Sequence, residues 1–184
     1  PKNYDRLIEI YEALAAHGYR EVGQEYLQNV LDTAKQLDAY DSGRIYYYLG
    51  EYQKAYLALD EARDKGGADS YLYLGRAYAA TGDYNYASSV YNNYLSKQGP
   101  NAEIYNELGL CEMAKKEYQN ALAAFQAGKQ IEGNSLMQTL SFNEIVAYEY
   151  LQDYQKAAVL LNAYLQNYPD DQAAIREQQF LSTR

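Results

Sequence analysis

A short pattern that recurs four times along the chain constrains its fold more than any other feature of the sequence. The central tyrosine of this pattern recurs at intervals of 32, 34 and 36 residues, with an alanine three positions later and a bulky hydrophobic residue seven positions later. Offsets of three and seven place these side chains on one face of an α-helix, so each copy predicts a helix that begins near its tyrosine. The copies occupy residues 50–55, 82–87, 116–121 and 152–157, and the seventh positions hold Leu59, Tyr91, Phe125 and Leu161.

A second periodic segment precedes each of these helices, and three of its copies carry a glycine in the same place. A glycine in the middle of a helix costs about 1 kcal/mol relative to alanine. The recurrence of Gly43, Gly75 and Gly109 therefore indicates that a neighbouring helix approaches closely at this position. Glycine and proline breaks separate one pair of segments from the next. The sequence predicts a run of helical hairpins, each burying its apolar faces against its neighbours.

The repeating unit, with Leu-Gly-Arg-Ala-Tyr at 74–78 and Gly-Asp-Tyr at 82–84, resembles the tetratricopeptide repeat. The resemblance implies an all-α fold, a right-handed superhelical solenoid of helix–turn–helix hairpins. The repeat that begins at Ala102 departs from the family pattern, with Glu112 in a tyrosine position and Lys116 in the turn glycine position, and the last repeat has Ile145 in the small glycine position. We expect these two units to pack with an altered tilt. We expect a single domain over residues 1–184, made of a degenerate repeat at 4–35, repeats at 36–67, 68–101, 102–137 and 138–171, and a capping helix at 172–184.

The charge of the chain excludes several classes of partner. A net charge of −9, from 25 acidic and 16 basic residues, argues against binding to nucleic acid or to an anionic membrane surface. No apolar run approaches the roughly 20 residues that span a bilayer. One cysteine and one histidine do not suffice for an internal disulfide framework or a multi-histidine metal site. We therefore expect no metal and no cofactor.

The residues that most often carry catalysis have structural explanations here. His17 lies at the expected end of the first helix, where a cationic side chain interacts favourably with the helix dipole. Cys111 occupies a small mid-helix position that is alanine in neighbouring copies, so we expect it to be buried and unreactive. The sequence contains no glycine-rich phosphate loop, zinc signature or nucleophile elbow. The chain is therefore not expected to be an enzyme or to contain catalytic residues.

The resemblance also predicts where a partner binds. In the family, the first helix of each repeat lines a concave groove, and here those helices are expected at 36–49, 68–81, 102–115 and 138–151. They contain eight acidic residues, three basic residues and ten of the 24 tyrosines. Matching positions to the family places these residues on the groove wall or at its edge: Tyr40, Arg44, Tyr47, Asp69, Tyr73, Arg76, Glu103, Asn106, Leu110, Phe142, Asn143, Val146 and Glu149. Glu107, four residues after Glu103 on the same helical face, is expected to contact the partner as well.

Arg44 and Arg76 occupy the same position in adjacent repeats and leave two interpretations open. In one, their guanidinium groups form a positive pair among tyrosines that binds a carboxylate or an aromatic side chain of a partner. In the other, both are solvated and paired with Asp41 and Asp69. A subset of the family binds the terminal carboxylate of chaperone tails through Lys and Asn. Because Arg44 replaces the first such Asn and the first helices contain no Lys before Lys115, we expect no chaperone-tail binding.

These observations favour a non-catalytic scaffold that binds a basic or polar protein or peptide along an acidic, tyrosine-lined groove. Two alternatives stay open, an exported bacterial envelope or cell-surface assembly factor or lipoprotein, and a polysaccharide-binding module. The abundance of Tyr, Asn and Gln with little Lys favours an exported location, in the periplasm or at the cell surface. Because the chain begins with Pro1, we expect it to be processed or to be a fragment.

Overall fold

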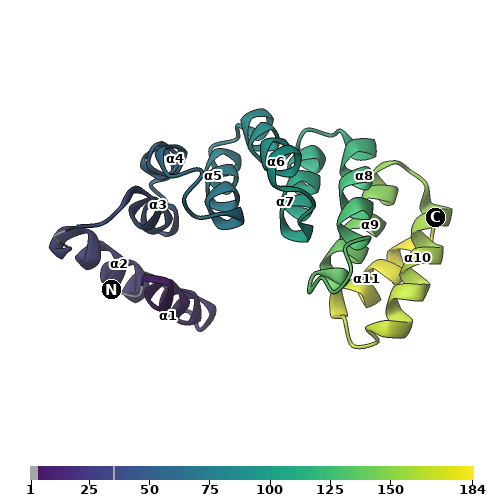
Figure 1. The fold of residues 1–184 in the computed structure, drawn as a ribbon. Helices are drawn as coiled ribbons and strands as arrows, with labels where there is room; N and C mark the ends of the chain where they lie inside the picture. The colour runs from purple at the N-terminus through teal and green to yellow at the C-terminus, as the bar shows by residue number, and fades with distance from the viewer. Residues whose placement is uncertain (1–3, 35) are drawn as a thin grey trace. The chain divides into compact units, whose positions relative to one another are not determined.

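The protein is built from α-helices joined by short turns, as the sequence predicts. The computed structural model describes residues 4–34 and 36–184, and within them it contains eleven helices and no β-strand (Figure 1). Each of the four repeating tyrosines is the first residue of a helix, namely of α4, α6, α8 and α10. The helices are α1 (Tyr4–Ala16), α2 (Arg20–Thr33), α3 (Ala39–Tyr48), α4 (Tyr52–Glu61), α5 (Ala68–Ala80), α6 (Tyr84–Gln98), α7 (Ala102–Ala114), α8 (Tyr118–Lys129), α9 (Met137–Tyr150), α10 (Tyr154–Asn167) and α11 (Gln172–Leu181).

One turn geometry recurs between paired helices. At each of five turns, the residue two positions before the second helix has a positive φ, and the amide of the next residue donates to a carbonyl five residues earlier. This is the Schellman ending, which satisfies carbonyls that the last helical turn leaves unpaired. Lys116, with a φ of 65°, adopts the conformation that glycine adopts elsewhere, so the turn survives the departure from the family pattern. The five residues are Gly18, Gly50, Gly82, Lys116 and Gln152.

The mid-helix glycines allow the close helix contacts that their recurrence predicts. A Cβ built on Gly43 would lie 2.5 Å from Cγ of Leu59, and one built on Gly109 would lie 2.6 Å from Cδ1 of Phe125. Leu59 and Phe125 are both fully buried and stand at the seventh position of the repeating pattern. The glycine of the first helix and the bulky residue of the second therefore occupy the same space, which confirms the inferred close approach.

The chain divides into two compact units, with the division inside α6. The first unit extends to Ala87, and its core includes Leu7, Leu27 and Ile45, contributed by α1, α2 and α3. The second unit begins at Ser88, and its core includes Phe125 and Leu140 together with a cluster between α9, α10 and α11. Among the described helices, none is both long and apolar enough to cross a membrane.

Candidate functional site

Tyrosines from α3 and α5 form a connected aromatic cluster in the first unit. The rings of Tyr47 and Tyr73 have centroids 5.5 Å apart, and the hydroxyl groups of Tyr48 and Tyr73 are 3.0 Å apart. Tyr47 and Tyr48 also meet edge to face, with centroids 5.3 Å apart. The predicted groove residues Tyr47 and Tyr73 are thus brought together. Tyr40 of α3 also reaches α5, where its hydroxyl lies 3.5 Å from Asp69. We call Tyr40, Tyr47, Tyr48 and Tyr73 the tyrosine patch.

Arg44 lies beside this patch, and its guanidinium forms ion pairs with two carboxylates of the protein itself. Nη2 donates to Asp41 at 2.5 Å, Nη1 donates to Asp5 of α1 at 2.6 Å, and the group lies 4.2 Å from the centroid of the Tyr40 ring. The side chain is 6% exposed. The expected pairing of Arg44 with Asp41 is present, whereas the expectation that Arg44 is solvated is wrong, because α1 supplies Asp5 as a second carboxylate. Burial acts to lower the pKa of Arg44, but the hydrogen bonds to Asp5 and Asp41 raise it, so the group stays charged.

Three carboxylates border the tyrosine patch, and each is held by one side chain of α3. Asp5 accepts from Arg44, Glu12 accepts from the hydroxyl of Tyr48, and Asp69 lies 3.5 Å from the hydroxyl of Tyr40. In each case the second carboxylate oxygen has no hydrogen-bond partner in the described part of the chain. Asp5, Glu12 and Asp69 are all exposed, Asp5 with 75% of its side chain accessible. The edge of the patch therefore presents fixed negative charge to solvent.

The phenol groups of Tyr40, Tyr48 and Tyr73 are neutral at physiological pH. Burial raises the pKa of Tyr40 to about 12, although the nearby Arg44 opposes the shift. Burial raises the pKa of Tyr48 further, and its hydrogen bonds to Glu12 and Tyr73 add to this effect. Burial also raises the pKa of Tyr73, while the positive charge of Arg76 acts in the opposite direction. Arg76 is half-buried on α5 beside the patch.

The remaining predicted residues belong to the second unit, on α7 and α9. Nδ2 of Asn143 donates to Oδ1 of Asn106 at 2.9 Å, which joins the two helices. Phe142 packs against Tyr164 of α10, with ring centroids 5.7 Å apart. Glu103 and Glu107 lie on α7, and both are partly exposed.

Glu149, the last predicted groove residue, lies near a carboxyl group of α11. Burial, and then the proximity of Glu177, raise the pKa of Glu149 to about 7. Its Oε1 atom is buried and has no hydrogen-bond partner among the described residues. The carboxyl group therefore gains a proton close to neutral pH.

Two of the acidic residues counted for the predicted groove are instead buried in ion pairs. Glu112 accepts from Lys115 at 2.7 Å and from Ser88 at 2.8 Å. Glu144 accepts from Lys129 at 2.5 Å and from Gln126 of α8. Both glutamates are less than a tenth exposed, so they neutralise lysines inside the helix packing and contribute little to the surface charge.

His17 and Cys111 have the surroundings that their structural interpretations require. Nδ1 of His17 lies 2.8 Å from the carbonyl oxygen of Ala13 at the end of α1. Cys111 is buried, and burial raises the pKa of its thiol to about 12, which keeps it protonated and unreactive.

The sequence interpretation missed three residues of this site, namely Asp5, Glu12 and Tyr48. Asp5 and Glu12 are seven positions apart and thus share one face of α1, a spacing visible in the sequence. No glycine or alanine pattern marks that face as the neighbour of α3. Tyr48 adjoins the predicted Tyr47, but only the packing of α1 and α5 around it reveals its hydroxyl contacts.

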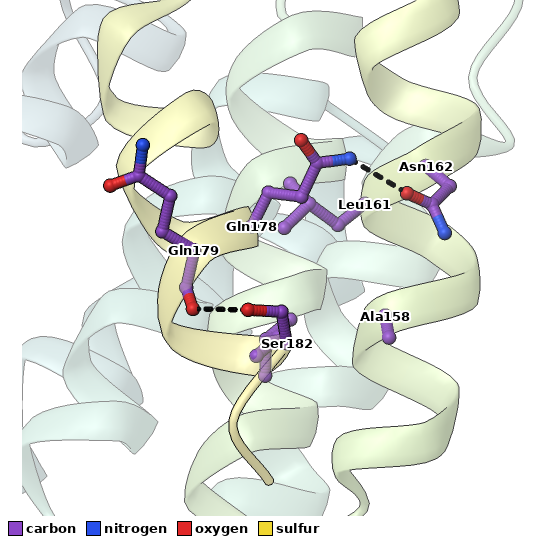
Figure 2. A pocket seen from close by; sticks show the side chains of 7 residues that line it. Ala158, Leu161, Asn162, Gln178, Gln179 and Ser182 are labelled. Carbon is purple, nitrogen blue, oxygen red and sulfur yellow. Dashed lines mark hydrogen bonds between the residues drawn. The ribbon is translucent and has the colours of Figure 1, made fainter.

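A cavity of about 430 Å³ lies apart from these residues, between α10 and α11 (Figure 2). Leu161 forms part of its apolar wall, and Nε2 of Gln178 donates to Oδ1 of Asn162 across it at 2.9 Å. Its lining carries no charged side chain, so the predicted site does not extend to it.

Comparisons with known proteins point to a single family. The family described as Tetratricopeptide repeat matches residues 40–87 and 74–135, which together span more than half of the chain. No match is found among curated proteins.

Among solved structures, a thermophilic TPR protein of Thermus thermophilus, TTC0263, is 16% identical, with 98% of this chain and 100% of that chain covered at a TM-score of 0.74. YrrB, a TPR protein with an unusual peptide-binding site, is 18% identical over 94% of this chain and 90% of its own, at a TM-score of 0.66. The second TPR domain of human RPAP3, in complex with the HSP70 peptide SGPTIEEVD, is 17% identical over 64% of this chain and 97% of its own, at a TM-score of 0.58. At these identities the likeness concerns the fold.

Proposed function

The chain belongs to the tetratricopeptide repeat family, and we propose that it is a non-catalytic scaffold that binds a protein or peptide partner. Fold alone does not determine function, so the proposal depends on the residues at the surface. YrrB and the RPAP3 domain, which share the fold, are described as having a peptide-binding site and as being in complex with a peptide. The proposed contact surface in the first unit is the tyrosine patch with its acidic border.

The observation that carries the proposal is the arrangement of Asp5, Glu12 and Asp69. Each carboxylate is fixed through one oxygen by a side chain of α3, and the other oxygen remains available. Fixing an acceptor before binding reduces the entropy lost when a partner is ordered against it. Tyrosine rings beside the carboxylates add apolar area and faces that attract cations. Such a surface suits lysine or arginine side chains, so the partner is proposed to be basic.

The second unit, taken by itself, also carries polar groups that suit a peptide. The hydrogen bond between Asn143 and Asn106 leaves Nδ2 of Asn106 as a donor and Oδ1 of Asn143 as an acceptor for a peptide backbone. Glu103, Glu107 and Glu149 place carboxylates on the same two helices. Reversing the charge of Glu103 and Glu107 together is expected to weaken the binding of a basic partner.

A peptide array tests the proposal directly. Peptides of equal length that range from acidic to basic are screened against the full chain, and the tightest binder is titrated calorimetrically. The double variant Asp5→Asn with Asp69→Asn is expected to weaken binding about three- to tenfold, because each exposed charge contact contributes up to about 1 kcal/mol. Raising the salt concentration is expected to weaken binding to the parent chain as well.

A matched control makes the same change in net charge elsewhere. Glu21→Gln with Glu25→Gln alters two exposed acidic residues of α2 that lie outside the patch. The control is expected to bind like the parent chain once melting curves show that all variants are folded. Equal losses in both double variants would reduce the effect to net charge alone, and preferential binding of acidic peptides would refute the proposed surface.

The same experiment includes the HSP70 peptide SGPTIEEVD, which is the ligand in the RPAP3 complex. This peptide carries three acidic side chains, and its terminal carboxylate would approach a border that is already negative. In addition, the guanidinium of Arg44 is occupied by Asp5 and Asp41. No binding is expected, and a micromolar affinity would contradict the acidic-surface interpretation.

A further inference from the structure

A cavity of about 330 Å³ lies in the first unit, and two residues of the tyrosine patch belong to its lining. Helix α1 supplies Tyr11 and Glu12, the start of α2 supplies Arg20 and Gln24, and the turn from α3 to α4 supplies Gly50 and Tyr52. Tyr47 and Tyr48 complete the wall. The volume falls in the lower part of the range that small-molecule sites occupy.

Four tyrosines shape the walls of this cavity. The rings of Tyr47 and Tyr52 have centroids 5.9 Å apart and are inclined by 56°, and the rings of Tyr11 and Tyr48 are 4.9 Å apart. Contacts among the rings and with the backbone hold them in place, since the hydroxyl of Tyr11 donates to the carbonyl of Tyr48 at 3.3 Å. Fixed aromatic walls of this kind offer flat apolar faces without a large ordering cost on binding.

Some polar atoms of the cavity form hydrogen bonds within the protein, and others can still bond a ligand. Nε2 of Gln24 donates to the carbonyl of Tyr48 at 3.3 Å, which leaves Oε1 of Gln24 as an acceptor. Oε1 of Glu12 accepts from Tyr48, which leaves Oε2. Within the described residues, neither Arg20 nor the hydroxyl of Tyr52 has a hydrogen-bond or ion-pair partner. The cavity therefore presents acceptors and donors together, at the edges of aromatic faces.

We infer that this cavity binds a neutral saccharide unit. Sugars display hydroxyl groups that both donate and accept, and their rings carry apolar C–H faces that pack flat on aromatic side chains. The lining meets both requirements through Arg20, Gln24, Glu12 and the tyrosine walls. The cavity shares Tyr47, Tyr48 and Glu12 with the acidic surface proposed for a basic partner, and it differs from that surface by adding Arg20, Gln24 and Tyr52.

The charge balance of the cavity selects a neutral ligand over a charged one. Glu12 and Arg20 are its two ionisable groups of opposite sign, and they cancel in a chain whose net charge is −9. A cationic ligand would meet the positive charge of Arg20, and an anionic ligand would meet Glu12. A neutral polyol instead forms charge-assisted hydrogen bonds with both groups.

Calorimetric titration of the full chain with defined ligands tests the inference. The neutral probes are maltohexaose, cellohexaose and the hexamer of N-acetylglucosamine. The ionic probes are the anion trigalacturonate and the zwitterion glycine betaine. Arg20→Ala and Tyr52→Ala are each expected to weaken binding of the neutral oligosaccharide about tenfold, the usual consequence of losing a charge-assisted hydrogen bond or an aromatic contact. Tyr26→Ala, which removes a tyrosine that is 54% exposed on α2 outside the cavity, is the matched control and is expected to bind unchanged.

The outcomes separate this inference from the proposed peptide function. Arg20 is exposed at the start of α2, so Arg20→Ala keeps the test valid even if Tyr52→Ala unfolds. Both variants keep Asp5 and Asp69, so each is expected to retain the binding of a basic peptide that Asp5→Asn with Asp69→Asn weakens. Failure of all three neutral probes to bind would overturn the inference. Tighter binding of trigalacturonate or betaine, or equal saccharide affinity in the parent chain and Arg20→Ala, would overturn it as well.

Discussion

Replacing Gly109 by alanine adds one methyl group that has two opposing effects on the stability of the fold. Gly109 lies in the interior of α7, where alanine is intrinsically more favourable than glycine by about 1 kcal/mol. The added Cβ, however, would lie within 2.7 Å of three ring atoms of Phe125 on α8. Phe125 is fully buried in the core of the second unit, so any movement of its ring must displace other core side chains.

The structure indicates which effect is larger. Overpacking a tight core costs about 1–3 kcal/mol, and a contact with three atoms of a rigid ring belongs in the upper part of that range. After subtraction of the gain in helix propensity, Gly109→Ala is expected to lower the free energy of unfolding by about 1–2 kcal/mol.

Gly128→Ala, also in a helix of the second unit, is the matched control. A Cβ at Gly128 would lie 3.0 Å and 3.1 Å from the two terminal carbons of Leu140 and 3.2 Å from Cβ of Tyr105. Leucine methyl groups can shift by a few tenths of an ångström, so this variant is expected to remain within about 0.5 kcal/mol of the parent chain.

Urea unfolding followed by circular dichroism measures both variants, with the midpoints compared at equal slope. A stability for Gly109→Ala equal to or above that of the parent chain would refute the close approach of α7 and α8. A loss for Gly128→Ala as large as that for Gly109→Ala would refute the argument from distances.

Three further predictions concern charges and a turn. The pKa of Glu149 rises in the folded state from its ordinary 4.5 to about 7, so the folded chain binds the extra proton between these values, and this contribution to stability is lost as the pH rises through about 7. Glu149→Gln is therefore expected to add about 1 kcal/mol of stability near pH 8, a value reduced for partial exposure, and nothing near pH 4. Identical pH profiles of the variant and the parent chain would contradict the effects of burial and of Glu177 on this pKa. Lys129→Met leaves the buried Glu144 without its cation and is expected to cost about 2–3 kcal/mol in urea unfolding, most of which Glu144→Gln should restore in the double variant. Lys116 has a positive φ, a backbone conformation that is strained for any residue except glycine. Lys116→Gly is expected to remove this strain and to raise the melting temperature by the equivalent of about 0.5–1 kcal/mol. A lower melting temperature would count against strain at this turn.

The surface residues were less predictable from the sequence than the helices. The family resemblance selected Tyr47 and Tyr73, which lie in contact, and Asn106 and Asn143, which are hydrogen-bonded. It also selected Arg44 as a solvated or ligand-binding group, whereas Asp5 of the first helix occupies and buries it. The number of acidic residues in the expected groove helices also overstated the negative charge of the surface. Some of these carboxylates, such as Glu112 and Glu144, are buried in ion pairs with lysines.

The amino-acid sequence by itself determined the all-α hairpin fold, the helix starts and the positions where helices touch. These features depend on local properties of the chain, namely the 3.6-residue period of apolar side chains and the absence of a side chain at Gly43 and Gly109. Only the tertiary structure decided which polar groups meet, such as Glu12 with Tyr48, or Glu149 beside Glu177. Those contacts join helices that are distant in sequence. The packing of these helices sets how deeply a carboxyl group is buried and how far it lies from other charged groups, and these two quantities determine whether it is exposed, paired or protonated. Periodicity specifies which face of a helix is buried, but not which side chain of another helix it will meet there.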